Sequence, residues 1–560
     1  MRRRIFELFH REFRGVREAA FLLALATIVS NLLALLRDRL LASRFGAGIE
    51  LDMYYAAFRV PDLLYAFSLF FVASTAIIPL FLERFSEGEQ RAQAFFDTVF
   101  SVFVTSVILL AIVAYVSMPF IVPFYVPGFD TESKQEVIAM SRILLVSQLF
   151  LGLSSLLSSI LQSFRKFFVY AATFLFYNIG IIAGILLFAP RWGLRGLAWG
   201  VVLGALLHII IQIPSLIRTG FYPRIGVWMF SEMAQVFQKS FPRTAGLVVA
   251  QITFVMVTAI ASTLGAGSIA VFQLSFNLQS IPLTVIGLSY SVAAFPTMAE
   301  LIIKHERAVF FKHVVSASRS IIFWTLPITV LFITLRAHIV RVVLGAGEFG
   351  WADTRLVAAS LALFAVGIVA QSLTALFVRA FYAIGNARVP LIINVFTLVV
   401  TVACSFFFVR ALQEIPAVHA SFFHILRVVD VPQAAVLGLP LAFALGALVN
   451  MALLGFYLRR MEGGEQFRLR VFIPFLCDIA FASMLLGVVS YTILQMSEPL
   501  FNGDTFLGIF SHGFLAGVCG IGSAVLFLHA RGNSELKDVR NVLGQKFWRK
   551  SAVGFEPEHL

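Results

Sequence analysis

Residues 31–79 begin with NLLALLRDR at 31–39 and continue through FGAG at 45–48, FRVPDLL at 58–64 and IIP at 77–79. Apolar runs flank these pieces, so charged residues fall inside predicted membrane helices or at their mouths. Such charges are costly in a bilayer and usually face a cavity, a partner or the interface. Two interpretations stay open for Arg37 and Asp38, namely snorkelling at the interface and a polar cavity lined by the first two helices. Because successive helical residues project about 100° apart, we expect no direct pair between these two side chains.

The composition is typical of a membrane protein. Of the 560 residues, 59% are hydrophobic and 13% are charged. Apolar runs long enough to cross roughly 30 Å of hydrocarbon recur from residue 19 to residue 530. They predict an all-α polytopic membrane protein with about fourteen transmembrane helices. The three cysteines lie within apolar runs, so no disulfide framework is implied.

Lys and Arg gather in alternate loops. They crowd the N-terminus, the loops at 84–91, 165–166, 218–243, 304–312 and 459–470, and the C-terminal tail, whereas the loops at 127–136 and 497–504 hold few. By the positive-inside rule, both termini are predicted to be cytoplasmic. The net charge of +13 is thereby assigned to topology. Nucleic acid is not expected as a partner, because the basic residues are dispersed among short loops.

An internal repeat is visible in the turns. Phe45-Gly-Ala-Gly48 recurs as Leu264-Gly-Ala-Gly267, and Val126-Pro-Gly-Phe129 has a counterpart in Ala346-Gly-Glu-Phe349. The members of each pair are separated by nearly the same length of chain, and six predicted spans fit into that interval. The two halves therefore share one orientation. Parallel six-helix repeats are an alternating-access transporter design, with the substrate site between the halves.

The repeat divides the chain into six predicted segments. They are an amphipathic cytoplasmic leader at 1–18, an N-lobe of six helices at 19–217, a cytoplasmic linker at 218–240, a C-lobe of six helices at 241–458, two further helices at 471–530 and a basic cytoplasmic tail at 531–560.

Helix breakers occupy matching places in both halves. Pro61 and Pro282 are each expected to remove a hydrogen bond and kink the second helix of their half. Kinks at matching depth would let the lobes bend apart on one side; a static kink that only shapes packing is the alternative. The turn glycines are candidate gate residues: Gly46, Gly48, Gly265 and Gly267.

The motifs resemble those of the MurJ/MviN family, the lipid II flippases of the MOP superfamily. The resemblance rests on Arg37-Asp38 with Phe45-Gly-Ala-Gly48, Asp52 and Phe58-Arg59-Val-Pro61-Asp62, and it continues in order to about residue 460. It implies two six-helix lobes around a central cationic cavity, with two extra helices bordering a groove for the lipid tail.

Several positions depart from the family pattern. An arginine usual in the family six residues before the Arg-Asp pair is Asn31 here, another is Tyr65, and a third is Asn277. Acidic residues that some members use to hold a cation are replaced by Val257 and Ser405. Asparagine can donate hydrogen bonds to a diphosphate but supplies no charge.

The resemblance implies that Arg37 engages the head-group phosphate of a polyprenyl-diphosphate lipid, assisted by Asn31, Arg59 and Asn277. Asp38 and Asp52 would orient these arginines or gate the outer mouth. The predicted protein is a lipid II flippase of the bacterial inner membrane that acts by alternating access in peptidoglycan synthesis and has cell-wall synthesis proteins as possible partners.

The alternatives are a MOP-type exporter of another amphiphile and a transport-dead scaffold for envelope-synthesis proteins. No enzyme, metal site or cofactor is expected, because the histidines are scattered and the Gly-x-Gly pieces lack a strand–helix context. Transport would then depend on an ion gradient, the membrane potential or the substrate's own gradient.

Overall fold

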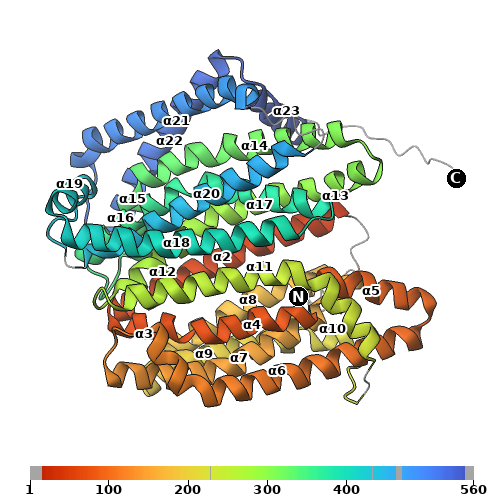
Figure 1. Ribbon diagram of the computed structural model, residues 1–560. Coiled ribbons are helices and arrows are strands. Elements are labelled where there is room, and N and C mark those ends of the chain that lie inside the picture. The colour runs from red at the N-terminus through yellow and green to blue at the C-terminus, as the bar shows by residue number, and fades with distance from the viewer. Residues whose placement is uncertain are drawn as a thin grey trace. The chain divides into compact units, whose positions relative to one another are not determined.

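The computed structural model describes residues 16–548 except 73, 165, 227–228, 432 and 462–468. Most of the predicted leader and the last twelve residues of the tail therefore lie outside the described residues. The described elements are helices joined by turns, with no strand among them (Figure 1). In chain order they are α2 (Val16–Phe45), α3 (Ile49–Ala57), α4 (Arg59–Val72), α5 (Ser74–Glu87), α6 (Glu89–Tyr125), α7 (Thr131–Ser163), α8 (Phe167–Ala183), η1 (Gly184–Phe188), α9 (Ala189–Ile210), α10 (Ile213–Ile217), α11 (Phe230–Ser262), α12 (Ser268–Pro282), η2 (Leu283–Leu288), α13 (Ser289–Ile303), α14 (Arg307–Thr334), α15 (Arg336–Leu344), α16 (Trp351–Val366), α17 (Ile368–Ala383), α18 (Arg388–Glu414), α19 (Pro416–Leu426), η3 (Ala434–Leu437), α20 (Gly438–Arg460), α21 (Leu469–Ser497), η5 (Glu498–Leu500), α22 (Phe506–Ala530) and α23 (Ser534–Trp548).

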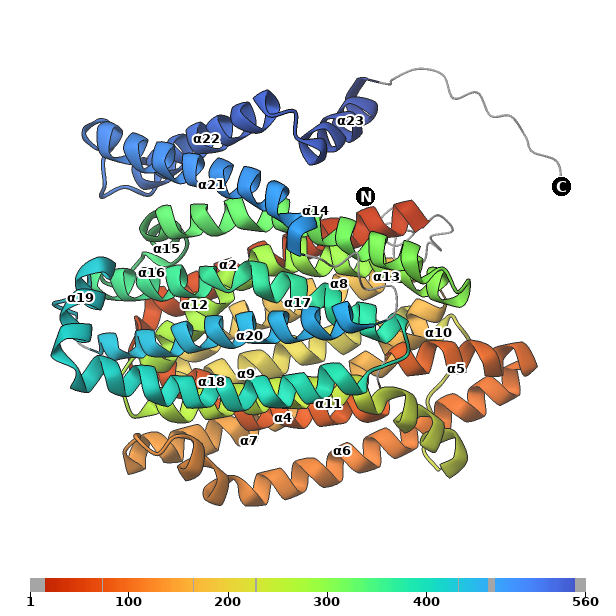
Figure 2. The ribbon, with the colours of Figure 1, turned by 45° about the horizontal axis from the view of Figure 1, so that its top comes forward.

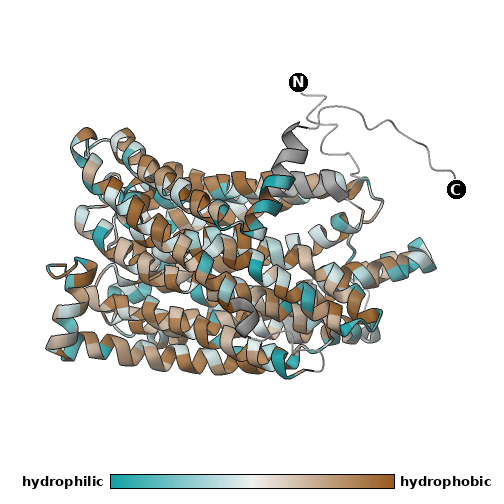
Figure 3. Cartoon of the chain, turned by 90° about the horizontal axis from the view of Figure 1, so that it is seen from above, coloured by the Kyte–Doolittle hydropathy of each residue, from teal (hydrophilic) through white to brown (hydrophobic). Residues whose placement is uncertain are grey.

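Apolar residues cover these helices along most of their length (Figure 3). Ten of the described helices are long and apolar enough to span a membrane, or up to eleven if the bent pair α16 and α17 forms one span. The predicted all-α polytopic membrane fold is confirmed, and the count of fourteen stays a prediction.

One apolar stretch of 51 residues, Phe167–Ile217, is long enough to cross a membrane twice. Its backbone leaves helical geometry at Gly193, where φ is 57° and ψ is −140°. A Cβ on Gly180 would lie 2.2 Å from Cα of Gly204, and one on Gly184 would lie 2.3 Å from Cα of Gly200. Glycines thus let α8 and η1 lie against α9 at backbone distance.

The chain forms two compact units. The first comprises Met1–Ile281, Val343–Phe364 and Asn386–Asn450, and the second comprises Pro282–Val342, Ala365–Gly385 and Met451–Leu560. In the first unit, α7, α8 and α9 lie side by side (Figure 2). In the second, α21 packs along both α22 and α14. The division into an N-lobe and a C-lobe stays a prediction.

The second span of the first half is broken before Pro61. Helix α3 ends at Ala57 and α4 begins at Arg59, so Pro61 lies in the first turn of α4. Pro61 has no N–H for the carbonyl of Ala57, and the hydroxyl of Ser141 donates to that carbonyl instead, at 3.0 Å. A side-chain donor on α7 thereby satisfies the backbone group that the proline leaves open. In the second half, α12 ends at Pro282 and continues into the π-helical segment η2.

Candidate functional site

A chain of hydrogen-bonded polar side chains runs through the first unit, beginning on α2. Ser30 and Arg37 are seven residues apart and share one face of this helix. Asn178, on α8, bridges them: its Nδ2 donates to Ser30 Oγ at 3.3 Å, and its Oδ1 accepts from Arg37 Nη1 at 3.3 Å. Helices α2 and α8 are therefore joined by a buried amide.

Arg37 and Asp38 form a direct ion pair. Arg37 Nε and Nη2 donate to Asp38 Oδ1 at 2.9 and 2.8 Å. The expectation that these neighbours would not pair was wrong. The two Cβ atoms point in directions about 100° apart, but the long arginine side chain folds back far enough for its guanidinium to reach the adjacent carboxylate.

The chain of hydrogen-bonded side chains continues from Asp38 to residues in the second half of the sequence. Asn277 Nδ2 donates to Asp38 Oδ2 at 3.0 Å, and Gln273 Nε2 donates to Asn277 Oδ1 at 2.8 Å. Gln273 Oε1 in turn accepts from Arg59 Nη2 at 2.8 Å. Residues of α2 and α4 are thus linked to α12 through two amide side chains.

Arg59 ends the chain in apolar surroundings. Its Nε donates to Thr258 Oγ1 at 2.7 Å, and its guanidinium lies over the Phe254 ring, 5.4 Å from the centroid. Within the described residues, the Arg59 side chain donates only to neutral groups, although the residue is only 5% exposed and the one carboxylate that interacts with it electrostatically, Asp62, forms no hydrogen bond to it. Such a buried cation is costly unless it serves a partner that carries negative charge.

The remaining predicted binding residue lies elsewhere. Asn31 is half-buried on α2, about 120° around the helix from the face of Arg37, and Ser30 takes the place in the chain. Tyr65, where the family pattern has arginine, pairs through its hydroxyl with Ser155 Oγ at 3.0 Å. Asp62 accepts from Gln148 Nε2 at 3.2 Å.

Asp52 joins the two glycine turns. Its Oδ2 accepts from the N–H of Gly267 and its Oδ1 from the N–H of Ala270, both at 2.7 Å. A carboxylate on α3 therefore caps the N-terminus of α12, where orphan N–H groups and the helix dipole favour negative charge. Gly267 has φ +91°, and a Cβ there would lie 1.8 Å from the Ala47 carbonyl oxygen. The turns 45–48 and 264–267 are in contact.

Two equivalent contacts flank this cap. A Cβ on Gly347 would lie 2.1 Å from the Ser43 carbonyl oxygen, and one on Gly128 would lie 2.1 Å from the Ser262 carbonyl oxygen. The shift along the sequence that carries Ser43 onto Ser262 also carries Gly128 onto Gly347. The same glycine-on-carbonyl contact is therefore made twice, each time between the two sequence halves.

The other candidate gate residues occupy the same turns or the helix breaks. Gly46 has φ +59° and faces the Glu348 carbonyl, whereas Gly48 precedes α3 as its N-terminal cap residue. Gly265 has φ +108° and lies against the Gln433 side chain.

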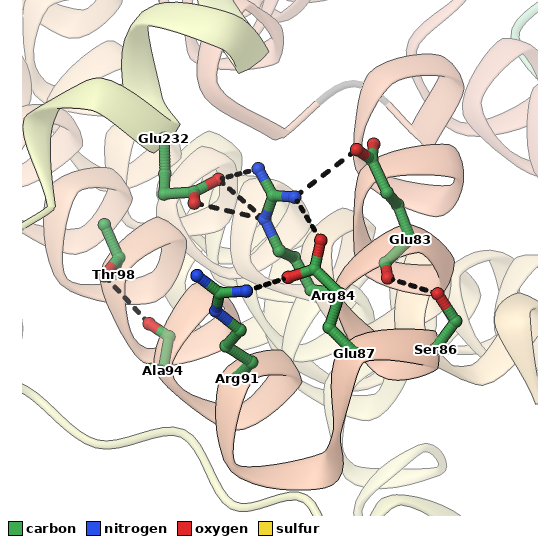
Figure 4. A network of polar contacts seen from close by, with 8 residues as sticks. All are labelled: Glu83, Arg84, Ser86, Glu87, Arg91, Ala94, Thr98 and Glu232. Atoms are coloured by element: carbon green, nitrogen blue, oxygen red, sulfur yellow. Dashed lines mark hydrogen bonds and ion pairs between the residues drawn. The ribbon is translucent and has the colours of Figure 1, made fainter.

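At the opposite ends of the helices, Arg84 forms a network of ion pairs (Figure 4). Arg84 Nε and Nη2 donate to Glu232 at 3.1 Å, and Arg84 Nη1 pairs with Glu87 at 3.2 Å and Glu83 at 3.4 Å. Arg91 pairs with Glu87 at 2.6 Å. The end of α5 is thereby tied to the start of α11.

Sequence reasoning missed the neutral members of the polar chain. They are Ser30, Asn178, Thr258 and Gln273. The available signal was an amide within an apolar run: Asn178 stands in such a run, and Gln273 lies one turn before Asn277.

The protein has helices long enough to span a membrane, and a buried chain of hydrogen-bonded polar side chains links its two sequence repeats. These features define a multi-pass membrane transporter. The model of the family "Lipid II flippase MurJ" matches residues 41–511. The chain therefore belongs to the MurJ lipid II flippase family, which confirms the resemblance.

Relatives and solved structures agree with this assignment. The lipid II flippase MurJ of Burkholderia cenocepacia is 25% identical over 452 residues, which cover 78% of this chain and 82% of the relative. A probable lipid II flippase MurJ of Bdellovibrio bacteriovorus is 25% identical over 91% of this chain and 94% of its own length.

In fold, the chain is similar to a lipid II flippase MurJ in an inward closed conformation. The TM-score is 0.72 and the identity 22%, and the match covers 91% of this chain and 99% of that structure. An inward-facing MATE family transporter of the MOP superfamily matches with a TM-score of 0.60 and 14% identity, over 79% of this chain and 94% of its own.

Proposed function

We propose that this protein flips lipid II, a polyprenyl-diphosphate-linked peptidoglycan precursor, across the bacterial inner membrane by alternating access. The observation that carries this function is the match of the lipid II flippase family over residues 41–511. Both termini would be cytoplasmic, and an ion gradient or the membrane potential would supply the energy. Cell-wall synthesis proteins are the expected partners.

Arg37 is the residue proposed to contact the diphosphate. Its side chain is 21% exposed, and Asp38 and Asn178 occupy three of its five N–H donors. The two remaining donors can bind phosphate oxygen. Arg59 adds positive charge, because within the described residues no carboxylate forms a hydrogen bond with it. Asn277 adds a neutral donor once its hydrogen bond to Asp38 is broken.

The contacts at the two ends of the first unit are the proposed gates. The Asp52 cap and the two glycine contacts would close the outer end, and the Arg84–Glu232 pair would close the inner end. Each gate joins residues of the predicted N-lobe to residues that follow this lobe in the sequence. Opening one end would therefore require breaking a small, defined set of contacts.

Transport of labelled lipid II in proteoliposomes tests this function. The parent should move the lipid, and Arg37→Ala should bind it roughly 30-fold or more weakly, by analogy with the 2–5 kcal/mol lost when one partner of a buried charge pair is removed. Binding is measured by native mass spectrometry on the folded variant. Transport of other amphiphiles but not lipid II would favour the MOP-type exporter, and no transport at all would favour the scaffold.

A further inference from the structure

A polar cavity of about 430 Å³ lies between α14 and the start of α23 in the second unit. This volume falls within the range of roughly 300–1,000 Å³ that is typical of small-molecule sites. The lining residues from α14 are Lys312, Val315, Ser316, Arg319 and Ser320, and those from α23 are Ser534, Glu535 and Asp538.

One ion pair holds the two walls together. Arg319 Nη2 lies 2.7 Å from Glu535 Oε1, and the Arg319 guanidinium lies over the Phe475 ring of α21, 4.7 Å from the centroid. Glu535 is 13% exposed, so this contact is largely covered. The pair compensates its own charges and fixes α23 against α14.

Two lining charges of opposite sign are left over. Lys312 comes from α14 and Asp538 from α23, and both residues are exposed. Within the part of the chain that the structure describes, neither side chain forms an ion pair. Three serines lie on the same lining. Ser320 Oγ donates to the Ser316 carbonyl at 3.2 Å and Ser534 Oγ donates to Glu535 Oε2 at 2.8 Å, so the Ser316 hydroxyl is the serine donor left for a ligand. Among the described lining residues, the cavity therefore offers one free cation, one free carboxylate and the neutral donor of Ser316.

The cavity lies at the ends of membrane helices. On α14 the run without charged residues begins at Ile321, directly after Ser320, and continues to Thr334. Helix α22 ends at Ala530, and the following Arg531 pairs with Asp478 of α21 at 3.1 Å. Polar residues at this level of three neighbouring helices mark the head-group region of a bilayer.

We propose that this cavity binds the head group of a zwitterionic phospholipid that carries a primary ammonium group. The phosphate would accept hydrogen bonds from Lys312 and the Ser316 hydroxyl, and the ammonium would donate to Asp538. A trimethylated ammonium has no N–H to donate, and an anionic head group without an ammonium would set its phosphate against Asp538. The lining thus favours a head group that carries both a phosphate and an ammonium with N–H groups.

Native mass spectrometry of the full chain tests the site with three lipids of identical acyl chains: phosphatidylethanolamine, phosphatidylcholine and phosphatidylglycerol. The parent should retain phosphatidylethanolamine about fivefold better than either of the others, the ratio that about 1 kcal/mol at an exposed charge produces. Lys312→Ala should lower retention of phosphatidylethanolamine and phosphatidylglycerol alike. Asp538→Lys should shift the preference to phosphatidylglycerol. Lys537→Ala, which changes a neighbouring exposed charge outside the lining, is the matched control.

Equal retention of phosphatidylethanolamine and phosphatidylcholine by the parent would overturn the proposal, and so would an unchanged preference in a folded Asp538→Lys variant. Equal unfolding temperatures of the variants and the parent establish that they are folded. The readout is independent of lipid II transport, so its failure would leave the proposed function untouched.

Discussion

Arg37 and Arg59 differ in the charge of their partners. The Asp38 carboxylate offsets the charge of Arg37 and accepts two of its N–H groups, whereas Arg59 donates to a hydroxyl and an amide. A diphosphate bound at Arg37 would lie close to a carboxylate. Asp38 therefore opposes substrate binding as long as it stays ionised beside the arginine.

Replacing Asp38 by Asn should strengthen binding of a polyprenyl-diphosphate lipid. The change removes the negative charge beside Arg37 and leaves only a neutral amide oxygen to compete with the diphosphate for its N–H groups, and hydrogen bonds to charged groups contribute roughly 1.5–3 kcal/mol. We expect affinity to rise about tenfold or more, measured by native mass spectrometry. Asp97→Asn is the matched control, since Asp97 is also buried but accepts from Gln93 Nε2 and the Arg224 N–H rather than from a residue of the polar chain. Weaker binding by a folded Asp38→Asn variant would mean that Asp38 positions Arg37 productively.

Sequence patterns identified the charged members of the site but not their partners. Charges and amides stand out against apolar helices, so the sequence reveals Arg37, Asp38, Arg59 and Asn277. The structure places all four in one hydrogen-bonded chain. Asn31 was selected by its place in the family motif, although helical phase puts Ser30 on the face of Arg37. Whether a guanidinium folds back onto its neighbour depends on its side-chain rotamer, which no sequence pattern contains.

Among the elements, the turns 45–48 and 264–267 are the proposed outer gate. Cysteines at Ala47 and Ala266 should cross-link readily, because Ala47 touches Gly267, the neighbour of Ala266. If the turns must separate for substrate release, the cross-link should abolish lipid II transport and reduction should restore it. The natural cysteines 404, 477 and 519 are first replaced by serine, and each single cysteine variant is the control. Full transport with the link in place would exclude this gate.

Helix α15 meets α22 through two histidines. His512 Nε2 lies 3.0 Å from the Leu494 carbonyl oxygen, so it donates there, and His512 Nδ1 accepts from His338 Nε2 at 3.3 Å. Burial, aided by His512 and Arg341, lowers the pKa of His338 to about 4. Arg341 Nη2 also lies 3.9 Å from Asp504 Oδ1. The folded protein thus keeps His338 neutral under conditions in which a free histidine takes up a proton.

The stability of the protein should therefore depend on pH below the ordinary histidine pKa of 6.5. Between pH 6.5 and about 4, the unfolded chain binds a proton at His338 that the folded chain does not, so stability falls as the pH falls. The unfolding temperature in detergent should drop across this window, and His338→Gln should flatten that slope by keeping a donor that does not titrate. His419→Gln, on the exposed loop helix α19, is the control. An identical slope in His338→Gln and the parent would contradict this assignment.

The elements themselves follow from apolar runs, whereas their breaks do not. Hydrophobicity places the long helices because the bilayer requires roughly 20 apolar residues for each span. Pro61 predicted the lost backbone hydrogen bond at the boundary between α3 and α4, but not that Ser141 of α7 would donate to the Ala57 carbonyl in its place. Such a break depends on a donor from another helix, which is a property of packing.

For the whole molecule, the contacts between the turns follow the sequence repeat. The Ser43–Gly347 and Ser262–Gly128 contacts are equivalent under the shift that relates the two halves, and each crosses from one half of the sequence to the other. The capping carboxylate breaks this equivalence, because the same shift carries Asp52 onto Val271. The proposed outer gate therefore has two symmetric contacts and one asymmetric charge, which the turn motifs alone did not reveal.

The orientation of the whole chain in the membrane is the prediction on which the gates depend. Basic loops alternate with nearly uncharged ones, so both termini should be cytoplasmic. In a chain whose natural cysteines are replaced by serine, a cysteine at Glu132 should react from outside with an impermeant thiol reagent. A cysteine at Glu89 should react only after the membrane is permeabilised, and both positions are exposed, so access alone decides the outcome. The reverse pattern would place the Asp52 cap at the cytoplasmic end and exchange the proposed outer and inner gates.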